Sequence, residues 1–299
     1  MRLLNQYHSI HIYLIGITLL PNSSGGREMV KIATIAGLDT SGGARLEADL
    51  KTFEEYGLYG MTAVTLIATM NPDNNWAHGV FPVDEKTLKA QLETIFKGVG
   101  ITAAKSGMLG TFYAVELTRE YISAYKVKNY VLDPVMVCKG NDEALNPELN
   151  QSITEKLLPL ANVVTPNLFE AGQLSGIKEI SSVERMKEAA KMIAEKGAVN
   201  VFVKGGSKLP DATEAIDLLY DGKNFELIKA PLIKTSWVHG AGCTVSAAIA
   251  AGLARGLSVY DAVVLAKKFI SQSLDGSFAL NKWVGPGNPT NWRENNLFS

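Results

Sequence analysis

The stretch KIATIAGLDTSGGARLEADLKTFEEYGLYGMTAVTLIAT (residues 31–69) carries the pattern from which the fold can be predicted. Its apolar, β-rich runs at residues 31–36 and 61–69 predict two strands. Between them, apolar residues recur at helical spacing over residues 45–56, and Gly57 follows as a stop signal. The stretch therefore predicts a strand, a helix and a second strand in succession.

The same alternation continues along the rest of the chain. Further strands are predicted over residues 102–105, 130–133, 162–165 and 199–204, a hairpin over 215–220 and 225–230, and helices over 85–96, 112–125, 169–175, 182–196, 244–255 and 259–274. Alternating strands and helices are typical of a mainly parallel sheet with helices on both faces. No repeat, low-complexity linker or change of composition divides the chain. We therefore expect an α/β fold with a single domain over residues 29–299.

Charge and cysteine content exclude several classes of function. The formal net charge is −1 and no basic block is present, so we expect neither nucleic acid nor a membrane surface as a partner. The two cysteines, Cys138 and Cys243, form neither a disulfide framework nor a zinc-ligand spacing. This use of cysteine fits a reducing compartment, and a cytoplasmic location is expected.

The first 28 residues form a separate segment in this interpretation. They contain an apolar run at residues 11–20, which is too short to span a bilayer as a helix and has a weak resemblance to a signal peptide. Met29 is followed at once by a strand-like run. We therefore expect residues 1–28 to be a non-native or disordered extension, with Met29 as the true initiator.

In open parallel sheets, ligands bind beyond the carboxyl ends of the strands. Glycine-rich or polar clusters follow the predicted strands repeatedly, at residues 37–43, 106–108, 133–134, 165–167, 204–206 and 240–243. Each cluster alone is typical of an ordinary strand-to-helix turn. Together they predict one ligand site along the carboxyl edge of the sheet.

The segment His-Gly-Ala-Gly-Cys-Thr (residues 239–244) runs directly into a stretch of small, helix-favouring residues. It predicts a tight turn that opens a helix, and the unpaired N–H groups of such a terminus bind anions. Cys243 lies inside this positive field, where a thiolate would be stabilised. A phosphate cradle with a candidate nucleophile or base indicates phosphoryl transfer. The alternative is a plain helix start with a small buried cysteine.

A series of motifs resembles the hydroxymethylpyrimidine/pyridoxal kinases of the ribokinase superfamily. The motifs occur in order at residues 36–44, 48–53, 59–62, 105–109, 133–136, 158–161, 165–171, 204–206 and 239–243. They extend over essentially all of residues 31–278. The resemblance implies a ribokinase-like fold, transfer of a phosphoryl group from ATP with Mg²⁺, a small-molecule substrate and a homodimer. It leaves open whether K⁺ assists.

Two vitamins compete as the substrate within this family. Kinases of the thiamine pathway usually carry Thr-Ala-Gln-Asn-Thr, whose glutamine contacts the aminopyrimidine, whereas this chain has Met70 at the glutamine position. A thioether cannot match the donor and acceptor of an aminopyrimidine edge. Residues 70–78, 137–140 and 281–286 instead resemble pyridoxal kinases of Gram-positive bacteria. The expected reaction is phosphorylation of the 5′-hydroxymethyl group of pyridoxal in vitamin B6 salvage.

Two alternatives to that reaction remain. One is a hydroxymethylpyrimidine/phosphomethylpyrimidine kinase of thiamine biosynthesis, against which Met70 argues. The other is a non-catalytic protein that binds a B6 vitamer and has kept the fold. The sequence also does not decide among pyridoxal, pyridoxine and pyridoxamine.

The resemblance implies catalytic roles at the start of the last-but-one predicted helix. The backbone N–H groups of Gly240, Ala241 and Gly242 would bind the transferred phosphoryl group. Most of the superfamily has an aspartate as general base at the position of Cys243. A thiolate there would take the proton of the substrate hydroxyl, and in the resembling pyridoxal kinases the thiol also adds to the aldehyde.

The nucleotide and metal contacts are implied by the same resemblance. Asn167 and Glu170 match the superfamily Asn-x-x-Glu element that holds Mg²⁺ near the phosphates, and Asp133 is expected in the same network. Lys139 and Lys204 are candidates for neutralising phosphate charge. The expected nucleotide contacts also include Gly205 and Gly206, which would let the nucleotide approach the backbone.

The candidate substrate contacts are Asp39, Asp49, Met70, Met108 and Cys138. Asp39 is expected at the polar edge of the pyridine ring, and the two methionines are expected on its apolar wall. Ordinary core packing is the alternative for the methionines and for Cys138, and local capping is the alternative for Asp49.

Several residues of this chain depart from the usual family pattern. Arg45 replaces a glycine at a helix start, and Leu38 replaces a serine in the same substrate loop. His78 and His239 are expected to make structural hydrogen bonds and are not chosen as the base. We expect these departures from the family pattern to affect substrate specificity more than the fold or the use of ATP.

Overall fold

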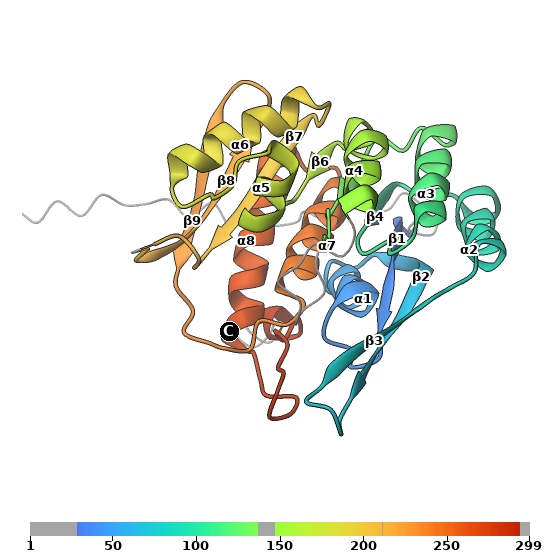
Figure 1. The fold of residues 1–299 in the computed structure, drawn as a ribbon, viewed down its shortest axis with the longest axis horizontal. Helices are drawn as coiled ribbons and strands as arrows, with labels where there is room; N and C mark the ends of the chain where they lie inside the picture. The colour runs from blue at the N-terminus through green and yellow to red at the C-terminus, as the bar shows by residue number, and fades with distance from the viewer. Residues whose placement is uncertain (1–28, 137–146, 211, 294–299) are drawn as a thin grey trace, which may run out of the picture.

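The computed structural model of the chain describes residues 29–136, 147–210 and 212–293. Their nine strands join one sheet in the order β3-β2-β1-β4-β5-β6-β7-β8-β9 (Figure 1). The strands are β1 (Lys31–Asp39), β2 (Tyr59–Asn71), β3 (Ala77–Pro82), β4 (Ala103–Ser106), β5 (Tyr130–Leu132), β6 (Val163–Val164), β7 (Asn200–Gly206), β8 (Glu214–Tyr220) and β9 (Phe225–Pro231). The helices are α1 (Arg45–Glu55), α2 (Glu85–Leu92), η1 (Glu93–Val99), α3 (Phe112–Ala124), α4 (Pro147–Lys156), η2 (Leu158–Leu160), α5 (Leu168–Ser175), α6 (Val183–Glu195), α7 (Ala241–Ala254) and α8 (Val259–Asp275).

The six central strands, from β2 across to β7, pair in parallel. Strand β3 joins one edge antiparallel, and the β8–β9 hairpin continues the other edge antiparallel to β7. The mainly parallel α/β fold predicted from the sequence is therefore confirmed, as is the hairpin.

Side chains of the strands alternate between two cores, as the period of two in a strand requires. Ile32 and Phe202 pack with α1, α7 and α8 on one face of the sheet. Ala33, Ile35 and Val203 pack with helices α2 to α6 on the other face (Figure 1). Helices thus cover both faces of the sheet.

Three elements of the described chain were not predicted from the sequence: strand β3, helix α4 and the short 3-10 helix η2. Strand β3 is largely exposed and lacks an alternating pattern, so only its pairing with the end of β2 makes it a strand. Helix α4 buries Leu149 and Ile153, four residues apart, which is too short a pattern to detect among its polar residues.

The predicted helix over residues 85–96 is only partly right. The α-helical segment α2 ends at Leu92, and the chain continues as the π-helical segment η1. The wider π turn keeps Ile95 and Phe96 buried in the core.

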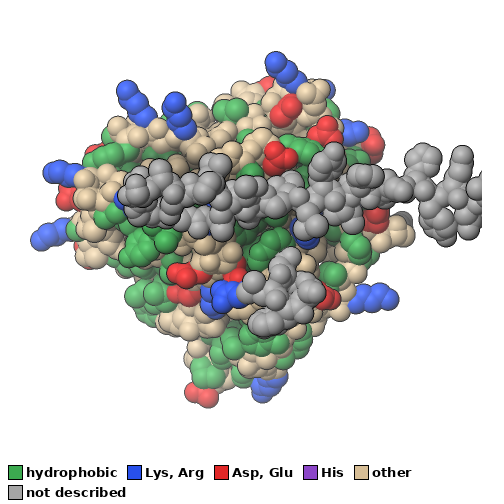
Figure 2. Space-filling model, turned by 180° about the vertical axis from the view of Figure 1, so that it is seen from behind, with side chains coloured by type: hydrophobic (Ala, Val, Ile, Leu, Met, Phe, Trp, Pro, Cys, Tyr) green, Lys and Arg blue, Asp and Glu red, His purple; other side chains and the backbone are tan. Residues whose placement is uncertain are grey.

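The surface carries no single basic region on the face shown in Figure 2. Lysine and arginine side chains are spread around the outline of that face rather than gathered into one patch (Figure 2). Among the described residues, no helix combines the length and apolar character needed to cross a membrane.

Candidate active site

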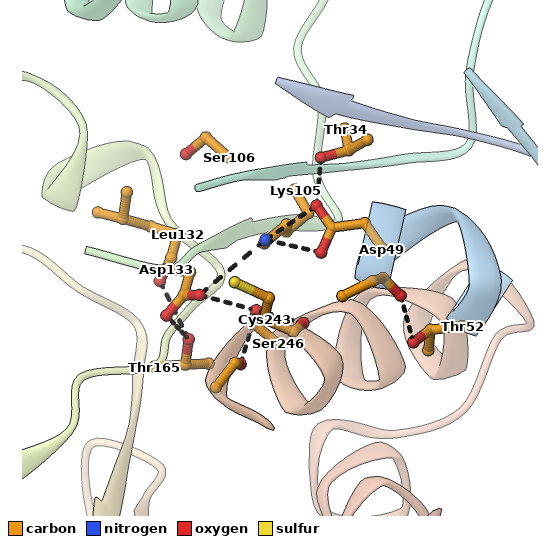
Figure 3. A network of polar contacts seen from close by, with 12 residues as sticks. Thr34, Asp49, Thr52, Lys105, Ser106, Leu132, Asp133, Thr165, Cys243 and Ser246 are labelled. Carbon is orange, nitrogen blue, oxygen red and sulfur yellow. Dashed lines mark hydrogen bonds and ion pairs between the residues drawn. The ribbon is translucent and has the colours of Figure 1, made fainter. Parts of the chain in front are cut away.

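A buried network of charged side chains lies at the carboxyl ends of the central strands (Figure 3). Its centre is Asp133, which follows β5 and is 2% exposed. Asp133 accepts hydrogen bonds from Lys204 Nζ at 2.8 Å and from Ser246 Oγ at 3.1 Å. Thr165, which follows β6, donates a longer bond of 3.3 Å to the same carboxylate. Strands β5, β6 and β7 and helix α7 thus meet at one carboxylate.

A second buried pair lies beside the first, between β4 and α1. Lys105 Nζ donates to both carboxylate oxygens of Asp49, at 2.8 and 2.9 Å, and Thr34 Oγ1 donates to Asp49 at 2.6 Å. Lys105 and Asp49 are both 0% exposed, and Lys105 Nζ is 4.0 Å from Asp133. The ammonium of Lys105 therefore joins two carboxylates from different elements, and they raise its pKa despite the opposing effect of burial.

The N-terminus of α7 (residues 240–243) faces this network. Gly240 caps the helix with φ +77°, and a Cβ there would lie 1.9 Å from the carbonyl oxygen of Gly43. Only glycine fits that position. A Cβ on Gly242 would lie 3.4 Å from Lys204 Nζ, so the ammonium lies next to the start of the helix. Ala241 N–H donates to Val238 O at 3.2 Å, so this predicted phosphoryl-binding group is already engaged.

The thiol of Cys243 does not behave as the sequence predicts. Burial raises its pKa to about 11, and the nearby carboxylates of Asp133 and Asp49 act in the same direction. Lys105 and the backbone N–H of Arg45 oppose this increase without cancelling it. This raised pKa contradicts the expectation of a stabilised thiolate and favours the protonated thiol at neutral pH.

Asn167 and Glu170 form the N-terminus of α5. Asn167 Oδ1 accepts from Glu170 N at 2.9 Å, and Glu170 Oε2 accepts from Asn167 N at 2.8 Å, which makes a capping box. Burial raises the pKa of Glu170 to about 7; Lys204 opposes this shift and Asp133 adds to it. Burial opposes charge on Lys204, but the nearby carboxylates of Asp133 and Glu170 raise its pKa. Its ammonium forms an ion pair with Asp133 at 2.8 Å.

Replacing Glu170 by glutamine should flatten the pH dependence of stability. In the folded protein Glu170 titrates near 7 against 4.5 for an ordinary glutamate, so the wild-type free energy of unfolding falls as pH rises from about 4.5 to about 7. The size of that fall is on the order of 1–3 kcal/mol. Glutamine keeps the capping acceptor and does not titrate. Urea unfolding at a series of pH values measures the difference, with Glu214→Gln as an exposed control. Parallel curves for wild type and Glu170→Gln would contradict the expectation.

The candidate substrate residues lie in three different surroundings. Asp49 belongs to the buried network already described. Met108 is buried against Leu66 and Ala68, which agrees with an apolar wall or with plain core. Met70 is half-buried, accepts a weak bond of 3.9 Å from Thr40 Oγ1, and lines a hollow of about 500 Å³ in the β2–β3 hairpin.

Asp39 is 1% exposed, and both of its oxygens are engaged within the protein. Oδ1 accepts from the N–H and hydroxyl of Ser41, and Oδ2 accepts from Ala44 N at 3.0 Å and lies 2.7 Å from His239 Nε2. Burial opposes ionisation, but His239 and Ser41 lower the pKa of Asp39 to about 2. Contact of Asp39 with the pyridine ring stays a prediction, in competition with this internal role.

The remaining predicted positions divide into described and undescribed ones. A Cβ on Gly205 would lie 2.4 Å from Ile216 O, and Gly206 has φ +54° with its N–H donating to Asp217 Oδ1 at 2.8 Å. The packing of β7 on β8 therefore requires glycine at position 205, whereas at position 206 it is the left-handed backbone that favours glycine. Cys138 and Lys139 lie outside the described residues.

The departure at Arg45 has a physical consequence. Arg45 has φ +58°, in the left-handed region that favours glycine, which is the residue usual in the family at this position. A non-glycine residue there costs about 1–2 kcal/mol. The Arg45 side chain is 9% exposed and so is packed into the protein, close to the substrate loop.

The sequence analysis missed Lys105 and Ser246 and gave His239 no specific partner. A signal for Lys105 was present, because a lysine inside an apolar parallel strand requires a buried counter-charge. Ser246 follows Cys243 by three residues, a spacing that places both side chains on the same side of α7.

Comparison with known proteins shows which family the chain belongs to. The family model described as phosphomethylpyrimidine kinase matches residues 39–288, and these include every described residue of the network except Thr34. The chain belongs to this family. The match confirms the resemblance on which the sequence analysis relied.

Within the family, the chain is more similar to the kinases named for vitamin B6. A pyridoxine kinase of Bacillus subtilis is 52% identical over 258 residues, which cover 86% of this chain and 95% of that protein. The pyridoxal kinase of Staphylococcus aureus, solved with AMP-PCP and pyridoxal, superposes with a TM-score of 0.84 at 43% identity and covers 89% of this chain and 96% of that one. A hydroxymethylpyrimidine/phosphomethylpyrimidine kinase of B. subtilis is 36% identical over 267 residues, 89% of this chain and 97% of that protein. The ribokinase-like fold expected from the resemblance is thereby confirmed.

Proposed function

We propose that this chain transfers the γ-phosphoryl group of ATP to the 5′-hydroxymethyl group of pyridoxal, which gives pyridoxal 5′-phosphate for vitamin B6 salvage. The observation that carries the proposal is the position of Lys204, whose ammonium lies 2.8 Å from Asp133 Oδ1 and 3.4 Å from the Cβ position of Gly242. An ammonium beside a helix N-terminus provides two sources of positive charge for the oxygens of a transferred phosphoryl group.

The proposed roles of the residues follow from this geometry. The N–H groups of Gly240 and Gly242 and the ammonium of Lys204 stabilise charge on the phosphoryl group as it is transferred. The thiol of Cys243 first gives its own proton to water, and the resulting thiolate then receives the hydroxyl proton of the substrate and becomes a thiol again. Ala241 contributes its N–H when the bond to Val238 is released.

Mg²⁺ is the metal that this donor set would hold. Asp133 and Glu170 are carboxylates, the hard oxygen ligands that Mg²⁺ prefers, and Asn167 positions Glu170 through the capping box. Within the described part of the chain, no group of three or more His, Cys, Asp or Glu side chains is placed to hold a metal. Bound Mg²⁺ would therefore take its other ligands from phosphates and water, and would neutralise charge on ATP. Assays with and without K⁺ decide whether this ion also assists the reaction.

Pyridoxal rather than hydroxymethylpyrimidine is the proposed substrate because of Met70. The wild-type protein should phosphorylate pyridoxal with a higher kcat/KM than hydroxymethylpyrimidine when both are assayed with Mg·ATP. Met70→Gln adds an amide that can pair with the aminopyrimidine edge, and should raise kcat/KM for the pyrimidine about tenfold. Single-substrate assays of pyridoxal, pyridoxine, pyridoxamine and the pyrimidine measure this.

The outcomes of these assays separate the alternatives. Wild-type preference for the pyrimidine would make the chain a thiamine-pathway kinase and would contradict the role of Met70. Tight binding of pyridoxal without turnover would instead support a non-catalytic binding protein. Turnover of pyridoxine equal to that of pyridoxal would show that the aldehyde is not needed.

The proposal extends to the organisation of the protein. We propose one kinase domain over residues 29–299, with residues 1–28 as an extension outside it, acting as a homodimer in the cytoplasm. Its partners would be the vitamer and the nucleotide alone, without nucleic acid or a membrane. Sedimentation of the purified chain at several concentrations measures the oligomeric state.

A further inference from the structure

His239 joins three segments that are far apart in the sequence. It directly precedes Gly240, the cap of α7, and is 7% exposed. Its ring Nε2 lies 2.7 Å from Asp39 Oδ2, and its backbone N–H donates to Gly285 O at 3.1 Å. The start of α7 is therefore connected through one residue to the β1–α1 loop and to the C-terminal segment.

Asp39 in turn fixes the loop that begins α1. Its carboxylate accepts from Ser41 and from the N–H of Ala44, which is the residue that caps α1. With a pKa of about 2, this carboxylate is an ionised acceptor over the range in which the enzyme would be assayed. The His239–Asp39 contact therefore connects the cap of α1 with the cap of α7.

The two loops also touch through their backbones. A Cβ at Gly43 would lie 2.6 Å from Cδ2 of His239, and a Cβ at Gly240 would lie 1.9 Å from Gly43 O. The Arg45 N–H, at the start of α1, interacts with the sulfur of Cys243. Backbones this close leave no alternative packing, so a shift at His239 would move the α7 N-terminus relative to α1.

We propose that His239 and Asp39 are a positioning pair, which sets the N-terminus of α7 against the β1–α1 loop so that the phosphoryl-binding N–H groups align with the substrate hydroxyl. This inference rests on the proposed function. It assigns His239 neither contact with substrate nor a proton transfer. It also explains why both oxygens of Asp39 are engaged inside the protein. Alignment matters at this point, because a misplacement of about 1 Å in a reacting group costs about 100-fold in rate.

Two substitutions at His239 separate positioning from general packing. His239→Leu keeps the approximate volume but cannot bond to Asp39, and should lower kcat about 10- to 100-fold. The KM values for ATP and pyridoxal should change little, because the lost alignment acts in the transition state. His239→Gln places an amide N–H near the position of Nε2 and should recover most of the lost kcat.

A double-mutant cycle with Asp39→Asn tests the pair itself. If the two residues act as one unit, His239→Leu combined with Asp39→Asn should lower kcat no more than the worse single substitution. The proposal would be overturned if the double variant lost kcat by the product of the two single losses. It would also be overturned if His239→Leu had the kcat of the wild type. A raised KM for pyridoxal in Asp39→Asn alone would assign Asp39 to substrate contact instead.

A second readout does not depend on turnover. In a Cys138→Ala background, Cys243 is the sole remaining cysteine, and its rate of alkylation by iodoacetamide reports its surroundings. His239→Leu should change this rate, whereas His239→Gln should leave it near that of the background. Equal rates in all three proteins would overturn the proposal. Absence of pyridoxal turnover in the wild type, with these rate differences present, would contradict the proposed function but not the positioning pair.

Discussion

Replacing Cys243 by alanine or serine should lower kcat for pyridoxal about 10²- to 10⁴-fold, the usual contribution of a general base. Serine is the more informative variant, because it keeps the shape and hydrogen-bonding capacity of the side chain but does not ionise in the accessible pH range. Steady-state assays with saturating Mg·ATP measure the loss. Lys229→Met, in an exposed ion pair with Glu214, is the control, and Cys138→Ala measures separately whether the other cysteine, a candidate substrate contact, contributes.

The dependence of kcat on pH should reflect the raised pKa of the Cys243 thiol. The pKa of Cys243 is about 11, so the ionised fraction grows about tenfold per pH unit from neutrality upward. The wild-type kcat should rise with pH over the same range, and Cys243→Ser should lack that rise. A substitution that removes a nearby negative charge, Asp49→Asn, should lower the thiol pKa and move the rise to lower pH.

Two results would contradict a base role for Cys243. One is a kcat in Cys243→Ser within about threefold of wild type, because loss of a general base costs far more. The other is a pH profile that stays the same when the thiol is removed. Either result would make Cys243 a residue that packs against the substrate, and the proton of the hydroxyl would then leave without a protein base.

The fold could be predicted because its signals are local. The parallel strands are short apolar runs, and most of the helices that follow them, though not α4, carry an apolar face and a stop signal, as in residues 31–69. The capping box at Asn167 and Glu170 was also readable, because its two members lie three residues apart. Strand β3 could not be predicted in this way, since it forms by pairing with β2 and its own residues carry no strand pattern.

The chemistry of the site could be predicted only in part, because its partners come from distant positions. The sequence placed Cys243 in the positive field of a helix terminus. It did not show that Asp49 and Asp133, almost 200 and 110 residues earlier, would stand near the sulfur and oppose its ionisation. The partner of Lys105 lies 56 residues away, and the partner of His239 lies 200 residues away. Such contacts are set by sheet order, which local patterns do not encode.

Replacing Lys204 by methionine should damage both activity and stability. Asp133 loses its 2.8 Å partner and keeps Lys105 at 4.0 Å, so the free energy of unfolding should fall by about 3 kcal/mol, the lower end for a broken buried pair. Loss of the ammonium beside Gly242 should lower kcat about 10²- to 10³-fold, as for other groups that stabilise charge in a transition state. Urea unfolding and steady-state kinetics measure the two effects.

The two effects of Lys204→Met can be separated by their controls. Lys229→Met breaks the exposed pair of Lys229 with Glu214, and should change stability by less than about 1 kcal/mol and leave kcat unchanged. Lys204→Arg keeps the charge, but its larger guanidinium cannot occupy the position of the compact ammonium beside Gly242, so it should restore stability better than activity. If Lys204→Met loses stability but keeps more than about a tenth of kcat, a smaller loss than removal of such a group causes, Lys204 holds Asp133 in place and does not act on the phosphates. The proposed site would then have to bind phosphate through the helix terminus alone.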